Sequence, residues 1–230
     1  MNNERSLFPA PAHENIRNNA LTAFLVLEAL ILFIAAPLSA HGIQAPLLVG
    51  GLLGAAVLLA VVTISRSAGA RALTLAATIM AIAGAVMRVS VPSMLTVWLG
   101  HLAMIAALLG ISTVIVQAVF APGRITHHRI EGAVILYLNI ALAFTSIFRL
   151  IQELNPDAFA QIPAQPGEVA AVSNMLYFSF TTLTSTGFGE ILPIDPFARS
   201  MANLESVLGQ LYLAILLARL VTMHVESRRH

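Results

Sequence analysis

The sequence contains no cysteine and no lysine, and only 10% of its residues are charged. The absence of cysteine excludes disulfide bonds, thiolate catalysis and thiolate-bound metal ions. Arginine supplies all 12 of the strongly basic residues, and the formal net charge of +1 gives no basis for nucleic-acid binding. Soluble domains carry about 25% charged residues. Because so few charges cannot cover a soluble surface, we expect the bilayer to be the solvent of this chain.

Hydrophobic residues make up 58% of the sequence and are grouped in long runs. A transmembrane helix needs roughly 20 mostly apolar residues to cross about 30 Å of hydrocarbon. Six stretches meet this requirement and predict an all-α membrane protein with six transmembrane helices: 20–38, 46–65, 71–89, 95–120, 131–150 and 200–224. An alternative for the first stretch is a signal peptide, but its length and the acidic Glu28 within it favour a transmembrane helix.

The arginines alternate between the two ends of these predicted helices. Nine of them lie at one set of ends: Arg5, Arg17, Arg66, Arg71, Arg124, Arg129, Arg219, Arg228 and Arg229. Three lie at the opposite ends: Arg88, Arg149 and Arg199. Cytoplasmic loops are enriched in basic residues. The pattern therefore predicts a multi-pass protein of the cell inner (plasma) membrane, with both chain termini in the cytoplasm.

A short apolar segment, 172–183, lies in the long external stretch between the fifth and sixth predicted helices. It is too short to span a membrane, and Ser173 is a suitable N-cap for a short helix. The sequence T-S-T-G-F-G-E follows at 184–190. A half-helix that enters the membrane and an irregular segment that returns form a re-entrant loop. Such backbone is tolerated at membrane depth only where it is buried in protein or lines a watery cavity.

The residue types of this loop suit cation binding. Gly187 and Gly189 permit backbone angles that other residues resist, so that successive carbonyl groups can point the same way. Ser185 adds a hydroxyl oxygen below these carbonyls. Four copies of the loop around an axis form stacked rings of oxygen atoms, which replace the hydration shell of an ion. Because one loop cannot enclose an axis, we expect a homotetramer.

The segment 184–190 resembles the selectivity filter of potassium channels, whose pattern is T-T-V-G-Y-G-D. Both glycines match, and Phe188 keeps the aromatic residue between them. The resemblance implies a filter that consists of Thr184, Ser185, Thr186, Gly187, Phe188 and Gly189. It implies K+ binding at four of these residues: Ser185, Thr186, Gly187 and Phe188. It also implies that Tyr177 supports the filter from behind by reaching Glu190, which stands where the family has aspartate.

The resemblance extends over 131–224 and implies a pore domain at 126–230, with an outer helix, a pore helix, the filter and an inner helix. Gly209 matches the position of a gating hinge in the inner helix of the family. By the same resemblance, four residues of this helix line the inner pore: Gln210, Leu213, Leu217 and Val221. The last two are candidates for a hydrophobic constriction. K+ is implied as the permeant ion, and no cofactor is expected.

A cytoplasmic segment, 1–19, and a peripheral four-helix domain, 20–125, precede this pore domain. Voltage sensing needs several charges in the fourth helix, because each supplies only about 2.3 kcal/mol per 100 mV. The fourth predicted helix, 95–120, contains no basic residue except His101, so no steep voltage dependence is expected. The short segment after His224 predicts no cytoplasmic ligand-binding domain. We expect the peripheral helices to brace the pore or to bind membrane lipids.

Several ionisable residues have both a functional and a structural interpretation. Glu28 and His101 lie inside predicted helices, where they favour either a gating or proton role or a local pairing. Glu205 has Arg149 and Arg199 as candidate partners. Two histidines before the fifth helix are either a pH sensor or part of a solvated linker: His127 and His128. Five acidic residues either attract cations to the external mouth or belong to a solvated loop: Glu153, Asp157, Glu168, Glu190 and Asp195.

The sequence therefore predicts a passive, potassium-selective channel whose partners are other copies of the chain, membrane lipids and permeant K+. Three alternatives stay open: a weakly selective or non-selective cation channel, an accessory subunit, and a transporter with a broken helix. No nucleophile–base pair and no cluster with metal-ligand spacing is visible in the sequence. An enzyme is therefore not expected.

Overall fold

The computed structural model describes residues 11–35, 68–90, 93–119, 127–163 and 168–227. These residues form five long α-helices, one shorter α-helix, a π-helix, a 3-10 helix and two very short strands. The elements are α1 (Pro11–Leu30), the π-helix η1 (Ile31–Ala35), α4 (Ala68–Ser90), α5 (Met94–Val119), α6 (His127–Leu154), the 3-10 helix η2 (Pro156–Ala158), β1 (Phe159–Ala160), α7 (Glu168–Leu183), β2 (Leu192–Pro193) and α8 (Pro196–Ser227).

Five of the six predicted transmembrane stretches coincide with described helices, while the stretch at 46–65 and most of the segment 1–19 lie outside the described residues. Within the described part, three helices are long and apolar enough to cross a membrane: Met94–Gln117, His128–Leu154 and Pro196–Arg219. Two shorter apolar helices occur in α1 and α4, at Leu21–Ile34 and Thr74–Gly84. The all-helical membrane architecture is thus supported, and the count of six spans stays a prediction.

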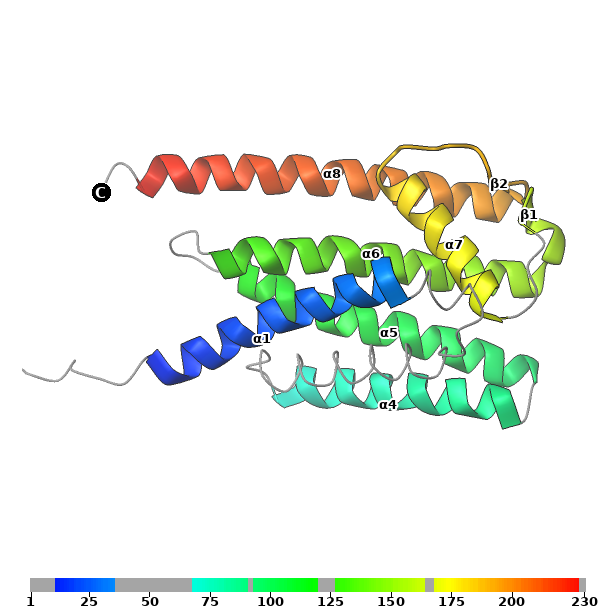
Figure 1. The fold of residues 1–230 in the computed structure, drawn as a ribbon, viewed down its shortest axis with the longest axis horizontal. Helices are drawn as coiled ribbons and strands as arrows, with labels where there is room; N and C mark the ends of the chain where they lie inside the picture. Colours follow the sequence, from blue (N-terminus) through cyan, green and yellow to red (C-terminus); the bar gives the residue numbers. More distant parts are fainter. Residues whose placement is uncertain (1–10, 36–67, 91–92, 120–126, 164–167, 228–230) are drawn as a thin grey trace, which may run out of the picture.

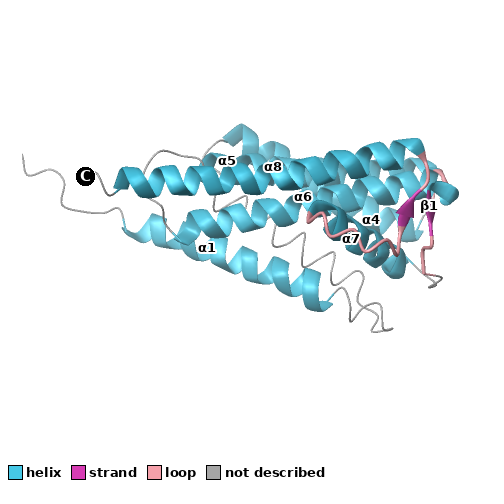
Figure 2. Ribbon diagram, turned by 90° about the horizontal axis from the view of Figure 1, so that it is seen from above, coloured by secondary structure: helices cyan, strands magenta, loops and turns pink. Residues whose placement is uncertain are grey.

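Helix α6 is the centre of the bundle, because it contacts α1, α5, α7 and α8, while α4 packs against α5 (Figure 1). The start of α1 and the end of α8 lie at the same end of the bundle (Figures 1 and 2). The short β1–β2 pair lies at the opposite end, where Phe159 pairs antiparallel with Pro193. Helix α7 is tilted between α6 and α8 and is much shorter than either.

The predicted start of the short helix is wrong. Helix α7 begins at Glu168, so that Ser173 lies inside the helix and is not its N-cap. Ala170 and Ala171 explain the difference, since alanine is the strongest helix former and extends the helix ahead of the serine. An acidic first residue also suits the partly positive N-terminus of a helix. The predicted end at Leu183 agrees with the structure.

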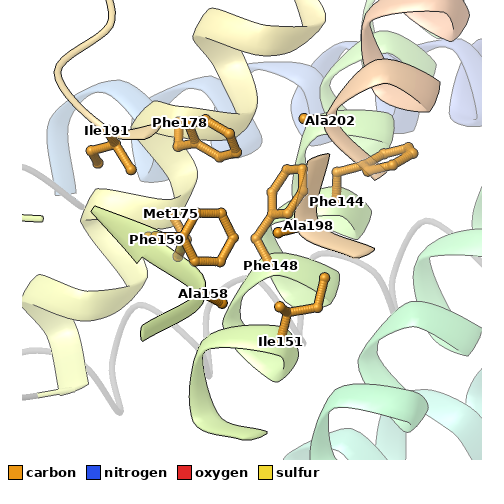
Figure 3. Packing of buried hydrophobic residues seen from close by; sticks show 10 residues of the cluster. All are labelled: Phe144, Phe148, Ile151, Ala158, Phe159, Met175, Phe178, Ile191, Ala198 and Ala202. Atoms are coloured by element: carbon orange, nitrogen blue, oxygen red, sulfur yellow. The ribbon is translucent and has the colours of Figure 1, made fainter. Parts of the chain in front are cut away.

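An aromatic cluster packs α7 against α6 and the β1–β2 pair (Figure 3). The ring of Phe178 lies 4.9 Å from Phe148 and 5.4 Å from Phe159, both in edge-on geometry. Edge-to-face contacts of this kind stabilise a core beyond simple burial. Ala198 and Ala202 bring the outer end of α8 against the same cluster. The cluster therefore fixes α7 at both of its neighbours, α6 and α8.

Helix α8 packs through one narrow face of mostly small residues. Among the described residues of α8, the buried ones are Ala198, Ala202, Glu205 and Gly209, whose spacing of four, three and four repeats once every turn. The half-buried Tyr212 and Leu216 continue this face against the core. A Cβ atom at Gly209 would overlap the carbonyl oxygen of Leu183, the last residue of α7. Glycine at this position therefore lets the backbone of α8 approach the end of α7. Asp195 caps the start of α8 by accepting the backbone N–H groups of Phe197 (2.8 Å) and Ala198 (3.2 Å).

Candidate functional site

The 184–190 loop leaves the C-terminus of α7 through a Schellman motif. The N–H of Thr186 donates to the carbonyl of Thr181 (2.9 Å), and the N–H of Ser185 donates to the carbonyl of Thr182 (2.9 Å). This pair of bonds requires a residue in the left-handed region between them, a position that glycine usually occupies. Here Ser185 occupies it with a φ of 55°. The turn satisfies the last carbonyl groups of the helix and sends the chain back across the end of α7.

Positive φ recurs at every second residue of the loop. Ser185, Gly187 and Gly189 have φ values of 55°, 57° and 79°, whereas Thr186 and Phe188 between them do not. A positive φ is uncommon for a residue with a side chain and easy for glycine. The alternation is a different geometry from a β-strand, in which successive residues point to opposite faces. The two glycines therefore adopt the special backbone angles for which the sequence analysis selected them, and Ser185 joins them.

Hydroxyl groups gather where the loop begins. The side-chain amide of Gln210 donates to the Ser185 hydroxyl (3.0 Å), and the Ser206 hydroxyl lies 3.0 Å from the same oxygen. Thr184 and Thr186 join their hydroxyls at 2.8 Å. Two predicted site residues, Ser185 and Gln210, thus meet directly. Ser206 was missed by the sequence analysis, although its position one turn before Gln210 was a signal that could have found it.

Tyr177 on α7 contacts both Phe188 and Glu190. Its ring stacks on Phe188, with ring centres 6.4 Å apart and planes inclined by 6°. A hydrogen bond to the Glu190 side chain, with smaller effects of burial and of the Glu190 charge, raises the pKa of the Tyr177 hydroxyl. The structure therefore brings Tyr177 and Glu190 together, the pair that the resemblance groups, and adds the contact of Tyr177 with Phe188.

The loop and one side of α8 are uncovered in the described chain. Phe188 is 67% exposed, and a Cβ atom added at Gly187 or Gly189 would meet no described atom within 4 Å. The predicted pore-lining residues are all exposed: Gln210, Leu213, Leu217 and Val221. Because their surfaces are exposed in a single described chain, these side chains are available to an ion pathway or to another subunit.

The ionisable residues near the C-terminal end of α6 form a local network. Arg149 donates to Gln152 (2.9 Å) and to Glu153 (2.7 Å), and the same Glu153 oxygen lies 3.4 Å from the His101 ring. This network links α5 to α6 and gives His101 the structural pairing that the sequence left open. The candidate pair of Arg149 with Glu205 is not formed. Glu205 instead contacts Ser179 on α7 at 2.5 Å, because the buried face of α8 directs its side chain to α7.

Two other candidate residues are placed by α1 and α6. Glu28 is completely buried, and neither of its carboxyl oxygens has a hydrogen-bond partner among the described residues. His128 lies in the first turn of α6, not in a linker, and its ring is 3.1 Å from Glu131. Glu131 also accepts the hydroxyl of Thr22 on α1 (2.8 Å). The histidine therefore belongs to the contact between α1 and α6.

A comparison with known families agrees with this arrangement. Residues 133–226 match a family model described as an ion channel. The match supports an ion channel. It covers most of α6, all of α7 and the loop, and nearly all of α8, which is less than half of the chain. No curated protein and no solved structure was found to match the sequence.

Proposed function

We propose that four copies of this chain form a passive, potassium-selective channel whose filter is the 184–190 loop. The observation that carries the proposal is the positive φ at Ser185, Gly187 and Gly189, in an exposed loop at the end of a short buried helix. Backbone of alternating handedness can turn a row of carbonyl groups toward one side. A ring of such rows is the kind of structure that replaces the hydration shell of K+. The ions would bind at Ser185, Thr186, Gly187 and Phe188.

The direction of α7 favours a cation. The helix ends at Leu183, directly before the loop, so its partly negative C-terminus lies beside the proposed ion sites. Residues Gln210, Leu213, Leu217 and Val221 would line the inner part of the same pathway. Gly209 would serve as the hinge of the inner helix, in addition to its packing against Leu183.

The tetramer is supported by what one chain leaves uncovered. Nearly all of helix α8 lies within the range that matches the ion-channel family model. Six of its large apolar side chains are more than one-third exposed in one chain: Leu204, Val207, Leu208, Leu211, Ile215 and Leu217. Lipid can cover part of this surface, but one loop cannot surround an ion. A second, third and fourth copy would complete the rings of carbonyl groups. We place the assembly in the plasma membrane, with both termini cytoplasmic and lipids around the peripheral helices.

The test is the bi-ionic reversal potential of the purified, reconstituted protein, with K+ on one side and Na+ on the other. A reversal potential far from zero, toward the equilibrium potential of K+, is the expected result. A current that reverses near zero would contradict potassium selectivity. Native mass spectrometry of the same preparation measures the subunit number, and a stable monomer or dimer would contradict the tetramer.

A second candidate is a weakly selective or non-selective cation channel. Phe188 favours it, because this residue lacks the hydroxyl of the family's tyrosine and its ring contacts Tyr177 while remaining 67% exposed. Fewer polar contacts behind a filter allow its width to vary. The same reversal-potential measurement separates the two candidates, and the absence of any current from intact tetramers would favour the accessory-subunit alternative.

A further inference from the structure

Glu205 is a buried carboxyl group at the junction of three helices. It lies on α8, has no exposed surface, and precedes Gly209 by one turn on the same buried face. Its Oε1 atom is 2.5 Å from the hydroxyl of Ser179 on α7, which is also completely buried. The Ser179 hydroxyl is in turn 2.8 Å from the carbonyl oxygen of Ala141 on α6. A series of polar contacts therefore runs from Glu205 on α8 through Ser179 on α7 to Ala141 on α6.

Few hydrogen atoms are available for the two contacts that Ser179 makes. A serine hydroxyl has one hydrogen to donate, and a backbone carbonyl has none. If Ser179 donates its hydrogen to Ala141, then the short contact between Ser179 and Glu205 needs a hydrogen from Glu205. If Ser179 donates to Glu205 instead, the 2.8 Å contact with Ala141 contains no hydrogen and brings two oxygen atoms together without attraction.

Burial decides between these two arrangements. The second carboxyl oxygen of Glu205, Oε2, is buried and has no hydrogen-bond partner among the described residues. A buried carboxylate without a cation is far more costly than a neutral carboxylic acid with one unpaired oxygen. Arg149, the candidate cation, donates to Gln152 and Glu153. The neutral acid is therefore the form that satisfies both short contacts.

We propose that Glu205 is a protonated, neutral positioning residue that donates its hydrogen to Ser179, so that Ser179 donates to Ala141 and α7 is held between α8 and α6. The effects of Glu205 on ion selectivity rest on the proposed channel function, whereas its protonation does not. Ser179 lies one turn before the end of α7, where the loop begins. Loss of the Glu205 hydrogen would turn Ser179 away from Ala141 and loosen the helix that supports the filter.

Two described polar side chains interact with Glu205. Tyr137 on α6 is titratable and interacts with it electrostatically, and Ser179 on α7 is polar and contacts it directly. Neither supplies a positive charge to an ionised Glu205. An alkaline solution is therefore expected to weaken potassium selectivity in the wild type by ionising Glu205. The substitution Glu205→Gln removes this dependence, because an amide donates the same hydrogen bond at every pH.

The first measurement is the infrared spectrum of the purified, full-length protein at neutral pH. We expect the carbonyl band of protonated carboxylic acids to be weaker in E205Q than in the wild type, while any contribution of the buried Glu28 is the same in both. The matched control is E153Q, in which the changed carboxylate is paired with Arg149, and it should leave the band unchanged. Identical bands in the wild type and in E205Q would overturn the proposal, whatever the protein conducts.

The second measurement is the K+ to Na+ permeability ratio of the same variants. We expect E205Q to keep the wild-type ratio at neutral pH and to show a smaller alkaline decrease than the wild type, because only the part caused by Glu205 is removed. We expect E205A to lower the ratio about tenfold, as for one lost buried hydrogen bond. An equal loss in E205Q and E205A would overturn the positioning role. If the infrared band is weaker in E205Q but no variant conducts, the proposed channel function fails while the protonated Glu205 stands.

Discussion

Ser185 and Tyr177 illustrate what individual residues contribute to the 184–190 loop. Ser185 has the left-handed backbone angle that usually selects glycine, and it is held there by the amide of Gln210 and the turn bonds to α7. A left-handed residue with a side chain costs about 1–2 kcal/mol. The hydroxyl contacts at 3.0 Å offset part of this cost. Local sequence alone would have assigned this conformation to a glycine.

The first prediction concerns Tyr177→Phe. This change keeps the ring that stacks on Phe188 and removes the hydroxyl that bonds Glu190. We expect a lower K+ to Na+ permeability ratio, by roughly fivefold, because the side-chain contact between α7 and the end of the loop is lost. The measurement is the bi-ionic reversal potential, and Phe188→Tyr is a useful comparison because it adds a hydroxyl to the ring on which Tyr177 stacks.

The pH dependence of this contact has a definite sign. Because the pKa of Tyr177 is raised, the folded protein favours the protonated phenol. The stabilisation is present below the ordinary tyrosine value of about 10 and is lost as the pH rises through the raised value. Tyr177→Phe should therefore remove the decrease in the permeability ratio that ionisation of the Tyr177 hydroxyl causes at alkaline pH. An unchanged permeability ratio in the phenylalanine variant would show that the hydroxyl does not support the loop.

At the scale of the helices, most of the fold could be predicted, because lipid imposes long apolar runs that a sequence displays openly. The ends of α5, α6 and α8 lie within four residues of the predicted spans. The start of α7 was misjudged because a serine cap and a pair of alanines compete in the same segment. The partner of Glu205 could not be predicted, since Ser179 and Glu205 are separated by 26 positions and meet only through helix packing.

The second prediction tests the contact between α8 and α7 with Gly209→Ala. The added methyl group would overlap the Leu183 carbonyl, which is backbone and cannot move aside. We expect destabilisation by about 1–3 kcal/mol, as for other overpacked sites, measured as a lower midpoint of thermal unfolding. A weaker permeability ratio should accompany it.

Gly132→Ala on α6 is the matched control. Its added methyl group would meet the tip of the Val119 side chain at 2.7 Å, and a side chain can rotate away. The control should therefore lower the unfolding midpoint less than Gly209→Ala does. Equal midpoints for the two variants would mean that α8 does not pack closely against the end of α7.

At the scale of the whole molecule, the third prediction concerns which residues share a side of the membrane. The start of α1 and the end of α8 lie at one end of the bundle, and η2 lies at the other (Figure 1). The chain has no native cysteine, so single introduced cysteines can be labelled without background. Asn19→Cys and Thr222→Cys should react with an impermeant thiol reagent from the same side, and Asp157→Cys from the opposite side.

All three positions are exposed in the described chain, so failure to react would not reflect burial within one subunit. Labelling from the cytoplasmic side for Asn19→Cys and Thr222→Cys would agree with the orientation that the arginines predict. Labelling of these two positions from opposite sides would contradict the antiparallel arrangement of α1 and α8, which puts the start of one and the end of the other on the same side.

The uneven packing of α8 has a mechanical consequence. Its buried residues end at Gly209, and no described residue of α8 beyond that glycine is fully buried. Beyond Gly209, the helix is held more lightly: Leu216 packs against the core cluster, and the Tyr212 hydroxyl donates to the Ala133 carbonyl on α6 (2.6 Å). The stretch from Gly209 to Ser227 is roughly 27 Å long, so a rotation of about 10° at Gly209 would displace its far end by ~5 Å. Such a rotation would have to break the Tyr212 hydrogen bond, which therefore resists any lateral movement of the second half of α8.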